Sequence, residues 1–173
     1  MKKPDILENQ VKQSYLAIGS NLGNKLENVE KAKFELQNNK IKIIKSSSNF
    51  ESESWPNSSH TKYINVVLEI KTMLTPFELL KTCNFIEKKL GRKRSVKNAP
   101  RSCDIDIIDY KQKLMNLANK HLILPHPRMH QRNFVLLPLF EINKIWKHPK
   151  SKKNIVNLVN SLPIKDLRSI KQI

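Results

Sequence analysis

The stretch that most constrains the fold is NAPRSCDIDIIDY, residues 98–110. Its second half alternates acidic and aliphatic side chains, which is the two-residue period of a β-strand. Asp104 and Asp106 are therefore expected on one face of a strand, with Ile105 and Ile107 on the other, toward a core. Two rises along a strand separate the carboxylates by about 6–7 Å. That separation suits two oxygen-liganded cations about 3.5–4 Å apart that bridge phosphate oxygens.

A basic segment leads into this strand. Arg101 stands just before the acidic pair, on a turn fixed by Pro100, and further Arg and Lys residues occupy positions 92–94 and 97. Arginine grips phosphate through its planar fork, so we expect a mobile basic loop that clamps phosphate beside a metal pair. The alternative for each feature taken alone is an edge strand with solvated acids and a solvated run of charge. The remaining sequence favours the functional interpretation.

The composition is that of a small basic protein. The chain has 173 residues, 39% of them hydrophobic, which is enough for one globular domain with a real core. The formal net charge of +17 favours anionic partners: nucleic acid, an acidic membrane surface or phosphorylated small molecules. Only six of the 32 cationic residues are arginines, and five of the six lie between positions 92 and 132. We interpret these arginines as placed for binding, and the lysines as mostly solvated.

The sequence carries no sign of export or of membrane insertion. Two cysteines, Cys83 and Cys103, could form at most one bridge, so no disulfide framework is implied. Residues 1–14 are polar and charged and lack the apolar centre of a signal peptide. No apolar run approaches the length of a membrane span. We therefore expect a cytoplasmic protein without a membrane partner.

Hydrophobic periodicity and capping residues predict a simple order of elements. The expected elements are a strand at 14–19, a helix at 25–38, a strand beginning at 41, a strand at 63–71, a helix at 76–90 and a strand at 103–110. Thr75 and Glu78 can form a capping box at the start of the second helix, and Gly91 suits its end. This order predicts an α+β fold, the ferredoxin-like βαββαβ arrangement of an antiparallel sheet with helices on one face.

The remaining segments receive less definite predictions. We expect a tail at 1–13, an exposed loop at 46–60 and a single domain over 14–173, within which 145–173 form a peripheral C-terminal extension of helices and loops. The apolar residues 134–142 should pack back on the core. The buried stripe of the helix at 76–90 should consist of Phe77, Leu80, Cys83, Ile86 and Leu90.

Two motif-like clusters do not carry the function that they suggest. Gly19, Gly23 and Lys25 suggest a phosphate loop, but a P-loop needs four residues between its glycines and a following Lys-Ser/Thr pair. His126 has a second histidine four residues further on, as helical zinc ligands do, but Pro127 interrupts the helix and no Glu stands in the metalloprotease position. Two flanking prolines hold His126 stiffly, which suits a fixed hydrogen-bond donor to phosphate.

Four segments together resemble one family, the 6-hydroxymethyl-7,8-dihydropterin pyrophosphokinases of folate biosynthesis. The segments are YLAIGSNLG at 15–23, YIN at 63–65, PRSCDID at 100–106, and LPHPRM with RNFVL between 124 and 136. Each segment alone is weak evidence, whereas all four in this order and spacing are highly specific. The resemblance covers residues 14–142 and implies transfer of the β,γ-pyrophosphoryl group of ATP to the pterin hydroxymethyl group, which leaves AMP.

The resemblance also implies roles for individual residues. The implied catalytic residues are Arg92, Arg101, Asp104 and Asp106, of which the two aspartates resemble the ligands of two Mg²⁺ ions. The implied ATP-binding residues are Glu87, Arg92, His121, His126 and Arg132. The implied pterin-binding residues are Ser52, Ser54, Trp55, Tyr63, Asn65 and Phe134. Within that set Phe134 would stack on the ring, and the amide of Asn65 would pair with its donor–acceptor edge.

The chain departs from the family pattern around the basic loop and the pterin pocket. Asn98 and Ala99 stand where some members have Trp-Gly, so an aromatic side chain that helps the loop to close is missing from the sequence. The loop is also slightly shorter than in the longer-loop members. Ser54 and Pro56 stand where Pro and Gly are frequent. These differences concern loop closure and the pterin lid rather than the reaction.

Two other readings compete with this one. A ferredoxin-like RNA-binding module would fit the net charge, but it would need aromatic side chains exposed on its central strands, and only 6% of the residues are aromatic. Asp104 and Asp106 would also repel a phosphate backbone. An inactive descendant is disfavoured by the presence of both acids and Arg101. We expect a stand-alone, monomeric kinase that binds ATP and the pterin and no nucleic acid.

Overall fold

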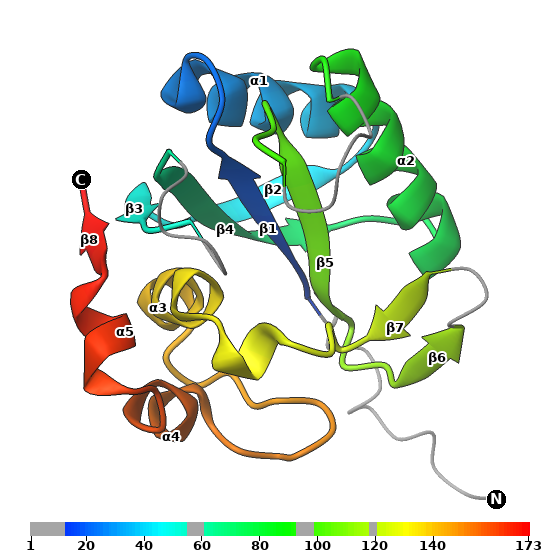
Figure 1. Cartoon of the computed structure of the whole chain (residues 1–173). Coiled ribbons are helices and arrows are strands. Elements are labelled where there is room, and N and C mark those ends of the chain that lie inside the picture. Colours follow the sequence, from blue (N-terminus) through cyan, green and yellow to red (C-terminus); the bar gives the residue numbers. More distant parts are fainter. Residues whose placement is uncertain (1–12, 55–60, 93–98, 118–120) are drawn as a thin grey trace, which may run out of the picture.

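One antiparallel sheet runs through the protein, with helices on both of its faces (Figure 1). The computed structural model describes residues 13–54, 61–92, 99–117 and 121–173. The strands are β1 (Ser14–Ser20), β2 (Lys42–Ser46), β3 (Phe50–Ser52), β4 (Tyr63–Lys71), β5 (Asp104–Tyr110), β6 (Met115–Leu117), β7 (Leu122–Leu124) and β8 (Ile170–Gln172). The helices are α1 (Lys25–Asn38), α2 (Pro76–Lys89), the 3₁₀ turn η3 (Met129–Gln131), α3 (Asn133–Ile142), α4 (Ile155–Asn160) and α5 (Ile164–Arg168). No helix within these ranges has the length and apolar character needed to cross a membrane.

The strand order identifies the fold class. The main sheet has six strands in the order β5-β1-β4-β3-β8, and β2 also pairs with β4. β2 and β3 follow one another along the same edge of β4, where β2 pairs with its end and β3 with its beginning. The positions β5, β1, β4 and β2/β3 are therefore those of a ferredoxin-like βαββαβ sheet. The predicted fold class is confirmed.

The first face of the sheet is covered by α1 and α2. Leu16, Leu68 and Ile105 project from this face and are buried against apolar residues of the helices such as Val29 and Ile86. The predicted capping box begins α2: the Thr75 N–H donates to Glu78 Oε2 at 2.8 Å, and the Glu78 N–H donates to Thr75 Oγ1 at 3.3 Å. Local sequence signals therefore placed α2 correctly.

The predicted buried stripe of α2 is partly wrong. Cys83 and Ile86 are buried as expected, but Leu79 and Glu87 are the other buried residues of this helix. Three predicted members, Phe77, Leu80 and Leu90, are only partly buried. The helix is rotated so that its buried face is centred on 79, 83 and 86, which places a carboxylate inside. The hydrophobic pattern alone could not predict that rotation, because such a pattern assigns a charged residue like Glu87 to the exposed face of a helix.

The second face carries a separate hydrophobic core. α3 packs here, and its Leu136 and Leu139 are fully buried beside Val67 and Ile108. The C-terminal region contributes four further buried apolar side chains, Trp146, Ile155, Leu158 and Leu162. It also adds β8 to the edge of the sheet beside β3. Residues 145–173 are thus more than the expected peripheral cap, and helices lie on both faces rather than on one.

The predicted exposed loop at 46–60 is wrong at its centre. Phe50 is buried, and β3 pairs with β4 through Phe50 opposite Asn65 and Ser52 opposite Tyr63. Three residues are too few for periodicity to reveal a strand, and the pairing partner lies further along the chain. Residues 55–60, including Trp55, fall outside the described part of the chain.

Candidate active site

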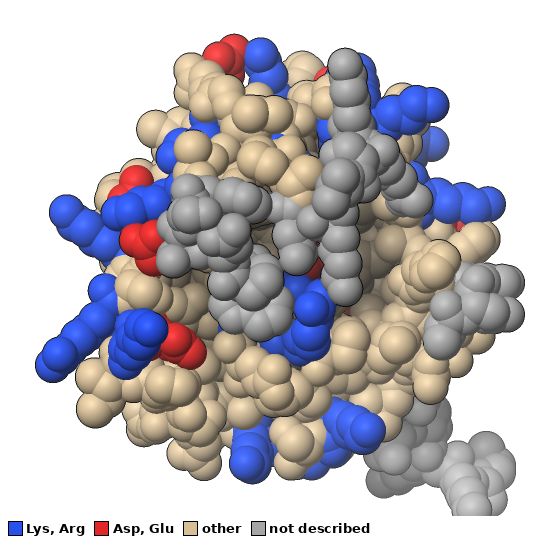
Figure 2. Space-filling view, in the orientation of Figure 1, with Lys and Arg blue, Asp and Glu red and all other residues tan. Residues whose placement is uncertain are grey.

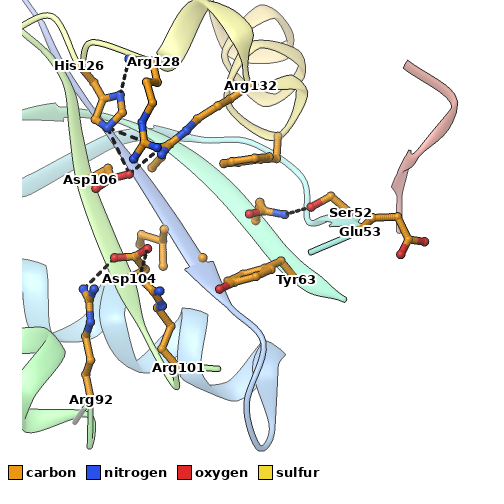
Figure 3. Close-up of a pocket in the computed structure, with 15 residues that line it drawn as sticks. Ser52, Glu53, Tyr63, Arg92, Arg101, Asp104, Asp106, His126, Arg128 and Arg132 are labelled. Carbon is orange, nitrogen blue, oxygen red and sulfur yellow. Dashed lines mark hydrogen bonds and ion pairs between the residues drawn. The ribbon is translucent and has the colours of Figure 1, made fainter. Parts of the chain in front are cut away.

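A cavity opens on the second face of the sheet, at the end where β5 begins and β1 ends. Fifteen residues line it, and they come from β1, β3, β4 and β5, from the residues before β5 and after β7, and from the start of α3 (Figure 3). Figure 2 shows basic side chains spread over this side of the molecule and at the rim of a central hollow. The apolar core of the second face occupies the opposite end. The cavity is therefore the part of this face that the helices leave uncovered.

The two acidic residues of β5 point into the cavity as predicted, while Ile105 and Ile107 are buried on the other face. Asp104 is held between two arginines: its Oδ1 accepts from Arg92 Nη1 at 2.7 Å and its Oδ2 from Arg101 Nη1 at 3.1 Å. Burial, followed by the neighbouring charge of Asp106, raises the pKa of Asp104, although the arginines oppose that shift. Both arginines belong to the predicted basic segment, and both contact Asp104, which follows that segment in the sequence.

Asp106 faces a second pair of basic side chains. Its Oδ2 accepts from Arg132 Nη1 at 2.9 Å and lies 3.7 Å from His126 Nε2. His126 Nδ1 accepts from the Arg128 N–H at 3.2 Å, so the proton of the neutral ring is on Nε2, which faces Asp106. Burial lowers the pKa of His126, against the opposing charge of Asp106. His126 thus presents Nε2 toward Asp106 as an oriented hydrogen-bond donor.

Glu87 supports Arg92 from beneath the cavity. Its side chain is buried, and its Oε1 accepts from the Ile105 N–H at 2.7 Å and lies 2.5 Å from Arg92 Nη1. Burial raises the pKa of Glu87 to about 7, although the Ile105 N–H and Arg92 oppose the shift. Glu87 is not among the lining residues, so its contact with the site runs through Arg92.

The opposite wall of the cavity is less charged. Asn65 Nδ2 donates to Ser52 Oγ at 2.9 Å and to the Phe50 carbonyl at 3.3 Å, which ties β4 to β3. Gly19 lies beside this wall, and a Cβ there would stand 3.4 Å from Asn65 Oδ1 and from the Tyr63 ring. The absence of a side chain at position 19 therefore leaves a recess floored by backbone. Phe134 borders it from α3, with the Arg132 guanidinium 5.4 Å from its ring centroid.

Most of the predicted site residues meet at this cavity. Those that line it are Ser52, Tyr63, Asn65, Arg92, Arg101, Asp104, Asp106, His126, Arg132 and Phe134. His121 is exposed in the turn before β7, and Ser54 is buried next to the wall, so neither is a lining residue. Trp55 lies outside the described residues. The predicted site residues did not include five that line the cavity, Ala17, Ile18, Gly19, Glu53 and Arg128. The clustering of five arginines between positions 92 and 132 was the signal for Arg128.

The donors present suit a hard divalent cation rather than a transition metal. Among the described residues, no group of three or more His, Cys, Asp and Glu side chains could enclose a metal ion. Asp104 and Asp106 offer carboxylate oxygens on one face of β5. Mg²⁺ is typically bound in this way, by one or two carboxylates together with substrate phosphates. The site therefore fits cations that arrive with a phosphorylated substrate.

Paired carboxylates among several guanidinium groups, next to an aromatic-bordered recess, are the arrangement of an enzyme that transfers phosphoryl groups. Residues 15–144 match the 7,8-dihydro-6-hydroxymethylpterin-pyrophosphokinase (HPPK) family, and the chain belongs to that family. The family predicted from the four sequence segments is confirmed.

Several curated proteins are similar to this chain. The 2-amino-4-hydroxy-6-hydroxymethyldihydropteridine pyrophosphokinase of Bacillus subtilis is 40% identical over 130 residues, which are 75% of this chain and 77% of that protein. The protein of the same name from Aquifex aeolicus is 38% identical over 139 residues, covering 80% of this chain and 85% of its own. The folic acid synthesis protein fol1 of Pneumocystis carinii is 33% identical over 156 residues, and the chain spans 21% of its length.

Solved structures share the fold. A crystal structure of HPPK-DHPS in complex with substrates matches this chain with a TM-score of 0.68 and 14% identity. The alignment covers 92% of this chain and 46% of the HPPK-DHPS chain. Wild-type HPPK-DHPS from Plasmodium falciparum matches with a TM-score of 0.63 and 15% identity. That alignment covers 90% of this chain and 42% of the Plasmodium chain. The chain thus spans just under half the length of these proteins.

Proposed function

We propose that this chain transfers the pyrophosphoryl group of ATP to the hydroxymethyl group of 6-hydroxymethyl-7,8-dihydropterin, in folate synthesis. The bond between the β-phosphorus and the oxygen that joins it to the α-phosphorus breaks, and that oxygen leaves with AMP. The pterin hydroxyl oxygen bonds to the β-phosphorus, and its proton is released to solvent. Family membership and the names of the bacterial relatives support this reaction. The observation that carries it is one cavity that holds Asp104 and Asp106, the basic residues beside them, and a polar and aromatic recess formed by residues such as Asn65 and Phe134.

Asp104 and Asp106 would hold two Mg²⁺ ions, because their carboxylates lie on one face of β5 and open to the cavity. When bound, these ions supply neutralisation of the phosphate oxygens and fix the triphosphate relative to the acceptor. The protein needs little covalent chemistry for such a transfer, since positioning and charge compensation supply most of the rate.

The basic side chains bind and orient the triphosphate. Each guanidinium carries five N–H donors, so Arg92 and Arg101 can bind phosphate oxygens with donors that do not face Asp104. Arg132 does the same beside Asp106. Nε2–H of His126 adds a neutral donor whose direction is set by the Arg128 N–H at Nδ1. Together they compensate the charge that spreads over the transferred group.

The recess between β4 and α3 binds the pterin. Both hydrogen bonds of the Asn65 amide nitrogen go to β3, so Oδ1 is presented as an acceptor for the amino edge of the ring. Gly19 keeps that edge accessible, because a Cβ at this position would lie in contact with Asn65 Oδ1, at 3.4 Å, and would occupy space in front of it. Phe134 offers a ring face for stacking. A cytoplasmic location belongs to the same proposal and is supported by the free thiols of Cys83 and Cys103.

Product analysis tests this proposal. The protein is incubated with Mg-ATP and the pterin, and AMP and ADP are separated chromatographically. We expect AMP that depends on the pterin and equals the pterin consumed. ADP in place of AMP would contradict pyrophosphoryl transfer, and a folded sample without nucleotide turnover would contradict the enzyme assignment. The basal rate without pterin is the matched control for hydrolysis.

A further inference from the structure

The C-terminal segment of residues 166–172 joins the two walls of the pterin recess, although it lies beyond the family match, which ends at residue 144. One wall carries Ser52 and Glu53, and the other carries Phe134. Figure 3 shows the C-terminal ribbon running beside Ser52 and Glu53. The two walls are distant in sequence, so a third segment that contacts both can fix the space between them.

The contact with the first wall is made by the backbone. β8 pairs with β3, with Ile170 opposite Ser52 and Gln172 opposite Phe50. The Glu53 N–H continues this pairing and donates to the Ser169 carbonyl at 3.4 Å. β3 has only three residues and pairs with β4 on its other edge, so β8 supplies half of the strand neighbours of this wall.

The contact with the second wall runs through one buried side chain, that of Asn133 at the start of α3. Its Oδ1 accepts from the Phe134 N–H at 2.7 Å. Its Nδ2 donates to the Asp166 carbonyl at 2.6 Å and to Ser169 Oγ at 3.0 Å. Ser169 therefore meets both walls, since its carbonyl bonds Glu53 and its hydroxyl bonds Asn133.

We propose that Asn133 and Ser169 are positioning residues that set the width of the pterin recess and thereby the affinity for the pterin, an inference that rests on the proposed function. Neither residue lines the cavity, so they act through Phe134, Ser52 and Glu53. The triphosphate side is anchored separately. Arg132 adjoins Asn133 in sequence, but its guanidinium is held by Asp106 at 2.9 Å. Weakening the hydrogen bonds of Asn133 to residues 166 and 169 should therefore weaken pterin binding and leave ATP binding unchanged.

Asn133→Asp is the informative substitution. It keeps the acceptor for the Phe134 N–H and replaces the two donors with an oxygen that faces the Asp166 carbonyl. We expect the pterin KM to rise by about tenfold, because a wider recess loses contacts that the ground state and the transition state share equally, while the ATP KM and kcat at saturating pterin change by less than about twofold. Ser169→Ala removes one hydroxyl and should produce a smaller rise in the same direction.

Asn143→Asp is the matched control at the other end of α3. Like Asn133, Asn143 uses both atoms of its side-chain amide. Its Oδ1 accepts from the Ile145 N–H at 3.2 Å, and its Nδ2 donates to Tyr15 Oη at 2.8 Å. It contacts neither wall, so its variant should lower Tm without a change in the pterin KM. Fluorescence titration of the pterin in the presence of a non-hydrolysable ATP analogue gives the same comparison without turnover.

The outcomes separate this inference from the proposed function. A pterin-selective loss in Asn133→Asp and Ser169→Ala, absent from Asn143→Asp, supports the positioning role. Variants that lose only Tm, or that lose ATP and pterin affinity equally, overturn it while the reaction of the unchanged protein stands. Should the unchanged protein form no pterin-dependent AMP, the proposed function fails and this inference falls with it. If Asn133→Asp does not fold, Ser169→Ala alone decides.

Discussion

The two faces of the sheet are built from the same strands but differ in what covers them. Against the first face α1 and α2 lie along β1, β4 and β5, and the side chains between them form one continuous apolar core. The second face is divided: α3 and the C-terminal region bury an apolar core at one end, and a charged cavity occupies the other. The cavity lies where the second helical layer stops, so that strand residues at positions that would otherwise face a core line an open space.

The largest expected difference between the open and the closed part of the second face concerns the acidic residues of β5. Asp106→Ala should lower turnover by about a thousandfold, roughly 4 kcal/mol, because it removes a charge that would bind the cations. Its effect on the free energy of unfolding should be small, since the side chain borders the cavity. AMP formation and urea unfolding measure the two quantities.

Asp109→Ala on the same strand is the control for that experiment. Asp109 is fully buried where the second face is closed, and its Oδ2 accepts from Trp146 Nε1 at 3.0 Å. The variant should lose about 1–3 kcal/mol of unfolding free energy, because the indole N–H is left unpaired, and should keep most of its turnover. Equal losses of turnover from Asp106→Ala and Asp109→Ala would contradict the division of the second face.

Two neighbouring residues of β4 test whether both cores stabilise the fold. Leu68 belongs to the first core and Val67 to the second, and both are fully buried. Leu68→Ala should lower the free energy of unfolding by about 3 kcal/mol and Val67→Ala by about 2 kcal/mol, since both leave cavities. Met73→Ala, at a side chain that is 96% exposed, is the control and should stay within about 0.5 kcal/mol of the unchanged protein. A Val67→Ala effect as small as the control would mean that the second core is not stabilising.

The smallest expected effect concerns pH and two histidines, His126 and His148, whose pKa is lowered by burial. Burial lowers the pKa of His148, whose Nδ1 accepts from the backbone N–H groups of Lys150 and Ser151. The unfolded chain therefore binds a proton more readily, so this contribution to stability is present above about pH 6.5 and is lost as the pH falls below it. In the cavity, Asp106 opposes the same shift at His126.

His148→Asn isolates that contribution, because the amide oxygen can still accept from the backbone but cannot be protonated. Urea unfolding at pH 7.5 and pH 5 should show the unchanged protein losing more unfolding free energy than the variant on acidification. A larger loss in the variant would reverse the sign and contradict the assignment. The comparison also controls for other titrating groups, which both proteins share.

Sequence patterns predicted a large part of the fold for local reasons. The alternation at 104–107 placed the acids and the isoleucines on opposite faces, and Thr75 with Glu78 began α2. Patterns failed where long-range contacts decide the structure. β3 and β8 are three residues long, and each exists because of a partner that is remote in sequence. Glu87 was expected off the buried stripe, yet Arg92 and the Ile105 N–H give its carboxylate partners inside.

The amino-acid sequence alone was enough to predict the order of the main strands and helices, the family, and most of the residues that line the cavity. These follow from local periodicity and from motifs whose spacing is written along the chain. The tertiary structure alone decided which arginine lies on which aspartate, that His126 presents Nε2, and that Ser169 touches both walls of the recess. Such pairings depend on the register of strands and the packing of helices, and those are set by contacts between residues far apart in the chain.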